Sequence, residues 1–543
     1  MSSTPRPRLL ARLAAASAAA MLALSGCTLL DGGGSGDAPA DDGGTGGGAT
    51  ADTAGQPGLQ ELGDSHADDL PTDPAEDPAY AAFYDQRIQW GVCEDVRSAD
   101  ISCGTITVPI AWDDPEGETI ELAVASVEAS GKGGRSLVTN PGGPGGSGIN
   151  FLEYLPYAIA PEVRQAFDIV SFDPRGVGRS APVECLDDEE IDELRAATAE
   201  AGSAEADELS AEWSTRLAES CEQTSGEILP YLDTWSSARD MDVLRAAVGA
   251  EELDYLGFSY GTYLGSSYAE LYPDRVGRFV LDGAMDPTLT MDELGAGQAE
   301  GFDKAARAFL SDCLASGDDC PFKGTEDEAV EQLISFFDSV DAHPLPTSDP
   351  DRPLTGSLAR AAVLSLLYAD SNWTTGYEAL TDAMNGDGDL LLTIADLSAE
   401  REDDATYRTN STVAISAINC LDHPGATDEQ WLEDEAERLA TDYPIFGADF
   451  GGNGCLDWPV PPLREPAPIA AEGAGPIVVI GTTGDPATPY AWAQSLADQL
   501  DDSVLLTFEG NGHTAYGRSG GCIEGQVNAF LVDGTVPEDG LTC

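Results

Sequence analysis

Basic side chains are scarce in this sequence of 543 residues. Lysine and arginine together number 26, against 97 aspartates and glutamates, and the formal net charge is -71. Lysine occurs only at Lys132, Lys304 and Lys323. A surface of this sign repels nucleic-acid phosphates and anionic lipid headgroups, so we expect no nucleic-acid partner and no membrane binding through a basic face. The acidity is typical of solvation in a salty or cell-exterior environment.

Histidine is also rare. The four histidines are His66, His343, His423 and His513, and no two cysteines have the CxxC spacing of a zinc or redox site. With so few ligands of the nitrogen and sulfur type, we expect no metal centre and no cofactor. An imidazole base, if the chain has one, must be one of these four residues.

The N-terminal apolar run, residues 13–24, is too short to span a bilayer. It follows three arginines and precedes small residues, which is the pattern of a secretory signal. Its end, Leu-Ser-Gly-Cys at 24–27, resembles the lipobox of bacterial lipoproteins, in which the cysteine becomes the lipidated first residue. We predict a lipoprotein signal peptide over residues 1–26 and lipidation of Cys27. Ordinary cleavage with an incidental cysteine is the alternative.

Residues 27–75 are rich in Gly, Asp, Ala and Thr and contain no aromatic residue, valine or isoleucine. Such a segment buries too little apolar surface to offset the entropy lost on ordering. We therefore predict a flexible tether between a lipid anchor and the folded part. The protein is then extracellular, either anchored to the outer face of the cell membrane or released from it.

The cysteine count supports an exterior location. Apart from Cys27, ten cysteines remain, and an even number is expected in an oxidising compartment. Loop closure favours near neighbours, so we predict sequential pairing. The predicted pairs are Cys93 with Cys103, Cys185 with Cys221, Cys313 with Cys320, Cys420 with Cys455, and Cys522 with Cys543.

Past the tether, short β-branched runs alternate with longer helical patterns, which indicates a mostly parallel sheet with crossover helices. The predicted strands are an antiparallel pair at 105–110 and 119–127, followed by buried strands at 136–139, 167–172, 253–258, 277–281, 477–480 and 504–508.

The segment 286–468 differs from its surroundings because its periodicity is helical. Capping-box patterns at 325–328 and 427–430 mark two helix starts. A helical block that interrupts a sheet is the layout of an α/β-hydrolase fold with a cap. We expect the core at 76–285, the cap at 286–468 and the core again at 469–543.

A nucleophile elbow is predicted at Gly257-Phe258-Ser259-Tyr260-Gly261, directly after an apolar strand pattern and before a helical run. In such an elbow the strand-to-helix turn strains the serine, and flanking glycines let neighbouring backbone approach. The helix N-terminus also favours developing negative charge. Ser259 is therefore our candidate nucleophile; a serine that only forms a turn is the alternative.

The candidate base is His513, in a glycine-rich loop after the last buried strand. His66 lies in the tether, and His343 and His423 each precede a proline in segments that we expect at the surface. The acid should follow the next-to-last strand, in the order serine, acid, histidine, and Asp485 stands there.

Acyl transfer needs N–H donors for the oxyanion. Tyr260, directly after the nucleophile, provides one main-chain N–H. The second is expected from the glycine-rich loop 140–148, with Gly143 as first choice and Gly142 as second. A flexible loop without a role is the alternative, since a phosphate-binding loop would need a lysine that is missing here.

Together these motifs resemble the proline iminopeptidase-like α/β-hydrolases, and within them the secreted tripeptidyl aminopeptidases of actinobacteria. The similarity covers nearly all of the chain after the tether. The motifs that carry it lie at 140–148, 173–180, 257–261, 282–283, 455–459, 485–489 and 512–514. The resemblance implies a serine exopeptidase that removes short peptides, expected to be tripeptides, from free peptide or protein N-termini. It also implies that Ser259 is the nucleophile, His513 the acid and base, and Asp485 the residue that orients the imidazole.

One departure concerns the glycine loop: the prolyl-specific relatives begin it with histidine, whereas this chain has Pro141. This favours the tripeptidyl branch. In the family the cap contributes acidic residues that bind the substrate's ammonium, and Asp422 is our hypothesis for that role. We interpret Arg175 and Arg179 as structural residues of the turn after the fourth strand.

Three alternatives compete with the exopeptidase. An esterase or lipase uses the same triad, although a cap lined by carboxylates would disfavour fatty acids. An endoprotease differs only in the geometry of the cap. A non-catalytic binding protein is disfavoured because all three triad residues are present. The sequence leaves the oligomeric state undetermined.

Overall fold

The computed structural model describes residues 58–65, 70, 71, 73–98, 100–132, 134–199 and 203–543. The predicted signal peptide, Cys27 and the tether up to residue 57 lie outside these described residues. Within the described ranges, no helix combines the length and the hydropathy that a membrane span requires.

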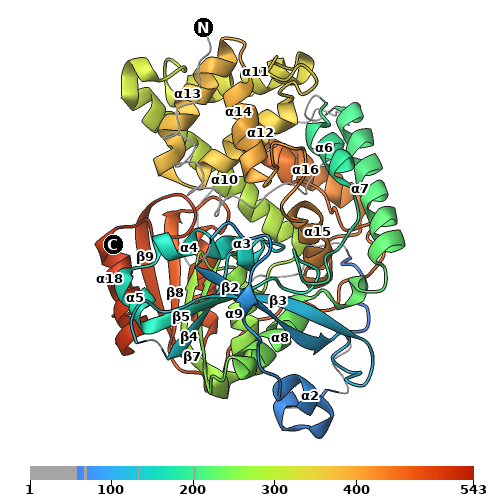
Figure 1. The fold of residues 1–543 in the computed structure, drawn as a ribbon. Coiled ribbons are helices and arrows are strands. Elements are labelled where there is room, and N and C mark those ends of the chain that lie inside the picture. The colour runs from blue at the N-terminus through green and yellow to red at the C-terminus, as the bar shows by residue number, and fades with distance from the viewer. Residues whose placement is uncertain (1–57, 66–69, 72, 99, 133, 200–202) are drawn as a thin grey trace, which may run out of the picture.

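One twisted sheet organises the fold (Figure 1), and in the described part of the chain it contains ten strands in the order β1-β2-β3-β5-β4-β6-β7-β8-β9-β10. From β5 to β10 all neighbours are parallel, whereas β1, β2, β3 and β5 pair antiparallel. The strands are β1 (Gly91–Val92), β2 (Ile101–Pro109), β3 (Thr119–Val127), β4 (Arg135–Asn140), β5 (Phe167–Phe172), β6 (Leu253–Phe258), β7 (Val276–Asp282), β8 (Ile477–Gly484), β9 (Ser503–Asn511) and β10 (Leu541–Thr542). All eight predicted strands are present.

Helices cover both faces of the sheet because its side chains alternate between two cores. On β8, Ile477 and Val479 belong to one core, and Val478 and Ile480 to the other. The first core includes residues of α8 (Thr234–Ala247), α9 (Tyr260–Leu271) and α17 (Tyr490–Gln499). The second includes residues of α3 (Gly148–Leu152), α4 (Leu155–Ala158), α5 (Pro161–Ala166) and α18 (Gly521–Asp533).

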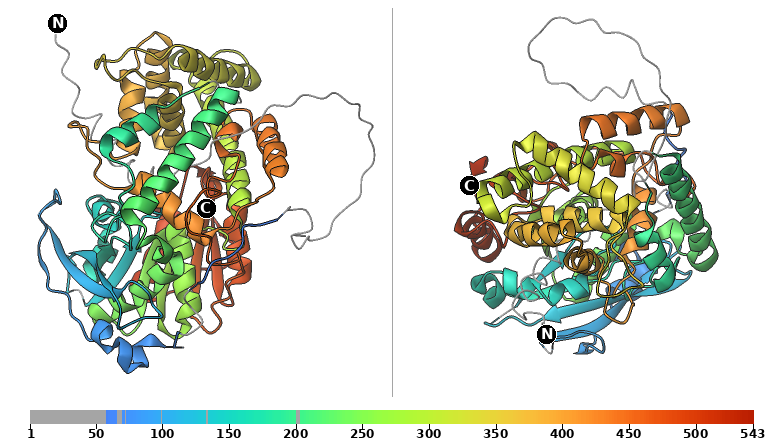
Figure 2. Two further views of the ribbon diagram at one scale, coloured as in Figure 1. Left: turned by 90° about the vertical axis from the view of Figure 1, so that its right-hand side faces the viewer. Right: turned by 90° about the horizontal axis from the view of Figure 1, so that it is seen from above.

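The chain between β7 and β8 is helical, and α11 to α14 form a lobe above the sheet (Figures 1 and 2). Its helices are α10 (Met291–Ser316), α11 (Glu326–Ala342), α12 (Gly356–Leu367), α13 (Trp373–Met384), α14 (Asp389–Ser398), α15 (Ser411–Asp422) and α16 (Glu429–Asp442). α10 to α14 contribute to a third core, which includes Phe309, Leu333 and Leu380. α15 instead packs Val413 and Leu421 into the first core, beside the sheet. α15 is therefore a cap element that reaches the sheet.

The helical lobe also includes a helix from the segment assigned to the core. α6 (Asp188–Ala196) precedes α7 (Ala204–Ser225) between β5 and α8, and Arg195 of α6 donates to the Ala395 carbonyl of α14 (2.6 Å). A boundary at residue 286 therefore does not separate the two packing units.

Two local predictions differ from the structure. The capping box of α11 is present at Thr325 and Glu328, but α16 is capped by Asp428 rather than Thr427. The N–H of Thr427 instead donates to the Gly58 carbonyl (3.0 Å), and Gln60 bonds to Gly425 and Cys455. The tether prediction is therefore wrong for residues 58–65, which bind to the cap through hydrogen bonds of their backbone and of the Gln60 side chain that composition does not reveal.

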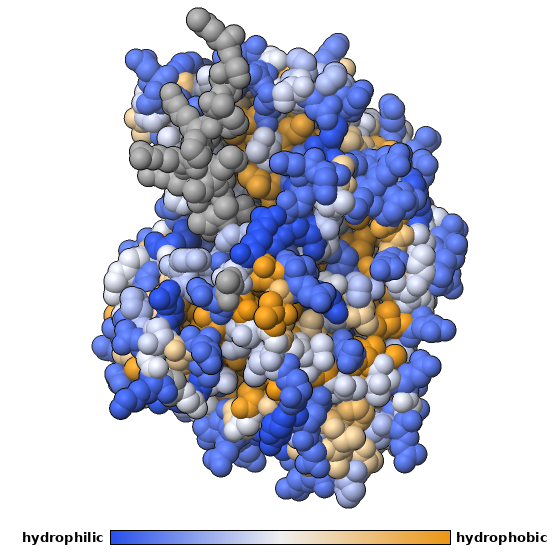
Figure 3. Space-filling model, in the orientation of Figure 1, coloured by the Kyte–Doolittle hydropathy of each residue, from blue (hydrophilic) through white to orange (hydrophobic). Residues whose placement is uncertain are grey.

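The segment before the sheet forms the short helix α2 (Ala81–Tyr84), and single 3-10 turns occur at Pro74–Glu76, Pro78–Tyr80, Leu229–Tyr231, Pro273–Arg275, Gly317–Asp319, Asp370–Asn372 and Gly447–Phe450. The disulfides of the described chain are those predicted from sequential pairing: Cys93–Cys103, Cys185–Cys221, Cys313–Cys320, Cys420–Cys455 and Cys522–Cys543. The surface in Figure 3 is largely hydrophilic, with separate hydrophobic areas.

Arg175 is a structural residue, as its sequence context suggested. Its guanidinium is fully buried and pairs with both carboxylate oxygens of Asp240, on α8, at 2.7 and 2.8 Å. The same guanidinium donates to the carbonyls of Ile110 and Tyr231. The pair therefore ties the turn after β5 to α8.

We expect Asp240→Ala to destabilise the fold by about 3–5 kcal/mol, because it leaves a buried guanidinium without its counter-charge. Urea unfolding followed by circular dichroism measures the change. The control is Lys304→Ala, which removes an exposed pair with Glu300 and should cost less than about 1 kcal/mol. Equal losses in the two variants would contradict a structural role for the buried pair.

Candidate active site

Ser259 occupies a strained turn between β6 and α9. Its φ of 55° and ψ of -128° lie in a region that residues other than glycine rarely adopt. Its N–H donates to the Asp282 carbonyl at 2.9 Å. The flanking glycines are required sterically: a Cβ on Gly257 would lie 2.4 Å from the Gly261 carbonyl oxygen. The local geometry is that of a nucleophile elbow.

Asp485 and His513 come together at the ends of β8 and β9. The Nδ1 of His513 lies 2.8 and 3.0 Å from the two carboxylate oxygens of Asp485, and both residues are buried. Three main-chain N–H groups, those of Ala487, Thr488 and Thr514, also donate to this carboxylate. Because the carboxylate accepts a hydrogen bond from the Nδ1–H group, Nε2 is the free basic nitrogen.

The elbow and the histidine loop meet at Gly283. A Cβ on Gly283 would lie 3.1 Å from Cε1 of His513, and the preceding residue, Asp282, accepts the N–H of Ser259. The Nε2 of His513 is buried and makes no hydrogen bond to any described residue. The hydrogen bond between a base and its nucleophile often tightens only in the substrate complex.

The loop 140–148 runs past the elbow, and the two candidate glycines differ in their contacts. The Gly142 N–H donates to Oδ1 of Asn140 at 2.8 Å, so it is already used. The structure gives the N–H groups of Gly143 and Tyr260 no partner among the residues it describes. The geometry therefore favours Gly143 and Tyr260 as the oxyanion donors. Gly142 instead packs closely against the elbow at Phe258 and Ser259.

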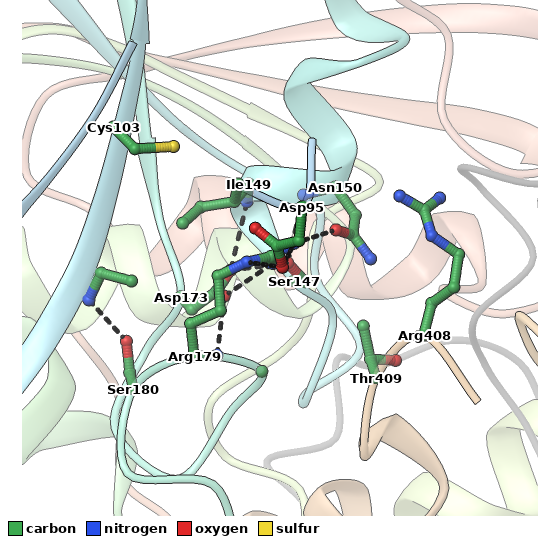
Figure 4. Close-up of polar contacts among 12 residues, drawn as sticks. Asp95, Cys103, Ser147, Ile149, Asn150, Asp173, Arg179, Ser180, Arg408 and Thr409 are labelled. Atoms are coloured by element: carbon green, nitrogen blue, oxygen red, sulfur yellow. Dashed lines mark hydrogen bonds and ion pairs between the residues drawn. The ribbon is translucent and has the colours of Figure 1, made fainter. Parts of the chain in front are cut away.

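Asp173 and Arg179 hold the far end of this loop (Figure 4). Oδ1 of Asp173 accepts the Ser147 hydroxyl at 2.6 Å and the Ile149 N–H at 3.1 Å, at the start of α3. Arg179 donates to Oδ1 of Asn150 at 3.1 Å. The turn at 173–180 thus fixes the segment that follows the glycine loop.

The cap supports the histidine loop directly. The N–H of His513 donates to the carbonyl of Tyr368 (2.8 Å), and the Tyr368 ring packs edge-on against the imidazole at 5.4 Å. Arg518 donates to the carbonyls of His513 and Thr514 at 3.0 and 2.9 Å. The sequence contains no signal for Tyr368 or Arg518, because their contacts join segments that are distant in the chain or use only the backbone of the partner.

Asp282 anchors the same loop from the sheet. Its carboxylate accepts the N–H groups of Ala515 (2.9 and 3.0 Å) and Tyr516 (2.7 Å), and burial raises its pKa to about 6. The motif at 282–283 contributed to the family resemblance, but its role was not evident from the sequence.

The other histidines are accounted for as follows. His343 is exposed, as expected, and His66 lies outside the described residues. The prediction that His423 lies at the surface is wrong: the residue is 1% exposed and its Nδ1 lies 2.9 Å from the Leu289 carbonyl. It follows α15, whose apolar side packs against the sheet, and burial lowers its pKa.

Asp422 is not placed to bind a substrate. It ends α15, is 3% exposed, and accepts the N–H and hydroxyl of Thr234 at 2.9 and 2.5 Å. Burial, with a contribution from Asp233, raises its pKa to about 8. Both carboxylate oxygens already have partners inside the protein, which contradicts the hypothesis of an ammonium-binding residue.

A cleft opens above Ser259, and two cap helices wall it. α10 contributes the helical face of Met291, Leu294 and Gln298, and α15 contributes that of Ile415, Ser416 and Asn419. Gly143, Thr488 and Trp492 line the cleft on the core side. No described residue that lines it carries a charge, which contradicts the expectation of a cap lined by carboxylates.

An elbow serine, a buried histidine–aspartate pair and two unpaired amides beside a cleft define a serine hydrolase of the α/β-hydrolase fold. Comparison with known proteins supports the assignment to the serine hydrolases. Residues 443–543 match the family model described as TAP-like protein. Over 477 residues the chain is 37% identical to serine protease Hip1 of Mycobacterium tuberculosis, covering 84% of this chain and 91% of that protein.

Two further relatives carry different names. Carboxylesterase B of Mycobacterium tuberculosis is 36% identical over 476 residues, covering 84% of this chain and 89% of that protein. Tripeptidyl aminopeptidase of Streptomyces lividans is 31% identical over 461 residues, covering 82% and 83%. The chain therefore belongs to the TAP-like family of serine hydrolases.

We expect Gly142→Ala to reduce turnover at least a hundredfold, because the added Cβ would lie 2.6 Å from the Phe258 carbonyl oxygen and 2.9 Å from Ser259 Cβ. The control is Gly249→Ala, at a glycine that also has positive φ but has no atom within 4 Å of the added Cβ. Turnover of an aryl ester by the two folded variants is the measurement. Equal turnover would exclude a tight contact between the loop and the elbow.

We expect thermal stability to decrease as pH rises. Burial raises the pKa of Asp422 to about 8 and that of Asp292 to about 6, above the usual value near 4, so these groups bind protons more tightly in the folded state. Their stabilising contribution is present below about pH 4 and is lost as pH rises through the folded pKa values.

Melting curves between pH 5 and 9 test this linkage. Asp422→Asn should flatten the pH dependence of the melting temperature, whereas Asp351→Asn, at an exposed position, should leave it unchanged. A slope that is identical in wild type and Asp422→Asn would rule out this origin.

Proposed function

We propose that this protein is a serine exopeptidase that hydrolyses peptide bonds near free N-termini and releases short peptides, expected to be tripeptides, through an acyl-enzyme on Ser259. The observation that supports this best is the position of the cleft, which begins at Ser259 and lies between cap helices α10 and α15. A substrate chain on the acyl side of Ser259 would run between these two helices. The 31% identity to a tripeptidyl aminopeptidase over most of both chains supports the same reading.

The proposed mechanism uses residues of the elbow, the histidine loop and the glycine loop. Nε2 of His513 takes the proton of the Ser259 hydroxyl while Oγ attacks the substrate carbonyl. The N–H groups of Tyr260 and Gly143 donate to the oxyanion, and Asp485 stabilises the imidazolium. His513 then protonates the leaving amine, and a water molecule, activated by the same nitrogen, hydrolyses the acyl-enzyme.

Neutral groups replace Asp422 as candidates for binding the substrate's amine. The polar residues of the two helical walls are Gln298, Ser416 and Asn419, and the amide nitrogen of Gln298 already donates to the Ala487 carbonyl. Oδ1 of Asn419 is buried and accepts no hydrogen bond from a described residue. Its acceptor capacity supports a role in binding substrate N–H groups.

Ester hydrolysis is the second candidate function. Met285, Met291, Leu294, Phe450 and Trp492 give the cleft an apolar lining without charge, which suits an apolar acyl group as well as an apolar peptide residue. The 36% identity to a protein named carboxylesterase B supports this alternative.

We also propose that the protein is exported and lipid-anchored through Cys27. The signal pattern in residues 1–26 supports this, and the five disulfides are compatible with an oxidising exterior.

The test compares a free-amine tripeptide anilide, its N-acetylated form and a short-chain aryl ester, with Ser259→Ala as the control for contaminating activity. We expect the free-amine peptide to be cleaved at least tenfold faster than the blocked one, and apolar residues to be preferred at the scissile bond. Equal cleavage of both peptides would indicate an endoprotease. Cleavage of the ester alone would leave the serine hydrolase and reject the peptidase.

A further inference from the structure

A buried chain of hydrogen bonds links the cap to the nucleophile elbow. It starts at Asp422, the last residue of α15, passes through Thr234, the first residue of α8, and ends at the hydroxyl of Tyr260, the first residue of α9. Thr234 donates its N–H to Oδ1 of Asp422 at 2.9 Å and its hydroxyl to Oδ2 at 2.5 Å. The hydroxyls of Thr234 and Tyr260 are hydrogen-bonded to each other.

The donors and acceptors give this chain a direction. Above its raised pKa, Asp422 is an acceptor only, so the Thr234 hydroxyl donates to it and the Tyr260 hydroxyl donates to Thr234 Oγ1. Asp422, Thr234 and Tyr260 are 3%, 0% and 2% exposed, so water does not reach them to replace a lost bond. A buried, fully satisfied network of this kind holds its members in one arrangement.

Tyr260 has two separate tasks in this geometry. Its main-chain N–H, unpaired among the described residues, is a candidate oxyanion donor, and its side chain is the end of the buried chain. An oxyanion donor must lie within a few tenths of an ångström of its working position. The residue before it, Ser259, has a strained backbone, and such a conformation persists only where surrounding contacts hold it.

We propose that Asp422 is a positioning residue for the oxyanion hole: acting through Thr234, it holds the side chain of Tyr260 and thereby the N–H that binds the oxyanion. The proposal assigns a role to a carboxylate that does not contact the substrate. It does not depend on the exopeptidase assignment, because ester and peptide hydrolysis both pass through an oxyanion.

The position of α15 extends this role to the cap. Ile415, Ser416 and Asn419 of α15 line the cleft, whereas Asp422 at its end holds Thr234. The disulfide Cys420–Cys455 fixes the same end of the helix. One rigid element therefore forms a wall of the substrate cleft and supports the oxyanion hole.

Thr234→Val tests the chain, because valine keeps the shape of threonine and removes its hydroxyl. We expect turnover per active site, counted by complete titration with a fluorophosphonate, to fall about tenfold, while KM changes less than twofold. Thr234→Ser should restore turnover. Any chromogenic substrate that the wild type cleaves, the aryl ester or the free-amine anilide, is suitable.

Two more variants locate the effect. Tyr260→Phe should lower turnover by a similar factor, and the double variant should lose little more than Thr234→Val, since both changes cut one chain. In assays above the Asp422 pKa, Asp422→Asn should also lower turnover, because the new amide donates to Thr234 Oγ1 and removes the acceptor of the Thr234 hydroxyl. The matched control is Ser267→Ala on α9, which removes a buried hydroxyl that has no hydrogen-bond partner among the described residues.

The possible results separate the explanations. A loss of turnover with unchanged KM, rescued by Thr234→Ser and absent in Ser267→Ala, supports the positioning role. Unchanged turnover per titrated site in Thr234→Val overturns it, as does a rise in KM at constant turnover, which would indicate a substrate contact. A smaller titratable fraction with wild-type turnover per site would indicate a purely structural role and would also overturn it.

Discussion

The contact between Asp485 and His513 depends on one irregularity in the pairing of β8 with β9. Thr482 pairs with Phe508, but the next pair is Gly484 with Asn511, so β9 carries one residue more than β8 over this interval. A bulge of this kind re-aims the side chains that follow it. Here it brings Asp485, directly after Gly484, next to His513, the second residue after Asn511. Without the extra residue, the His513 imidazole would point away from the Asp485 carboxylate, because a shift of one residue reverses the face to which a side chain points.

The cap is a structural part of the site as well as its cover. Tyr368 accepts the His513 N–H, α10 and α15 wall the cleft, and Asp422 reaches the elbow through Thr234. Contacts from the cap therefore reach both the base and the candidate oxyanion donor. A motion that separated the whole cap from the core would disturb these groups, so any opening for substrate has to leave these contacts intact.

The charge distribution separates long-range from local effects. The chain carries a net charge of -71, yet the described residues around the cleft are neutral. A field of this sign attracts cationic substrates and repels anionic ones over distances of a few Debye lengths at most. Inside the cleft, apolar contact and neutral acceptors decide what binds. The residues that attract a substrate to the protein therefore differ from the cleft residues that select it.

The sequence by itself was sufficient for the strands, the elbow motif, the disulfide pairs and the order of serine, aspartate and histidine. These features follow from local periodicity, from turn chemistry and from short loops, which a linear pattern records. It was misleading for His423, for Asp422 and for residues 58–65. Each of these is placed by partners far away in the chain: Leu289, Thr234, and residues 425–462.

Only the tertiary structure decided which residues line the cleft, which glycine has a free N–H and where α15 packs. Burial and hydrogen-bond partners depend on how elements pack in space, and an acidic residue has the same appearance in a sequence whether it is exposed or buried. With 97 acidic residues in the chain, composition could not single out the one that joins the cap to the elbow. The local patterns therefore determined the chemistry of the site, and long-range packing determined its surroundings.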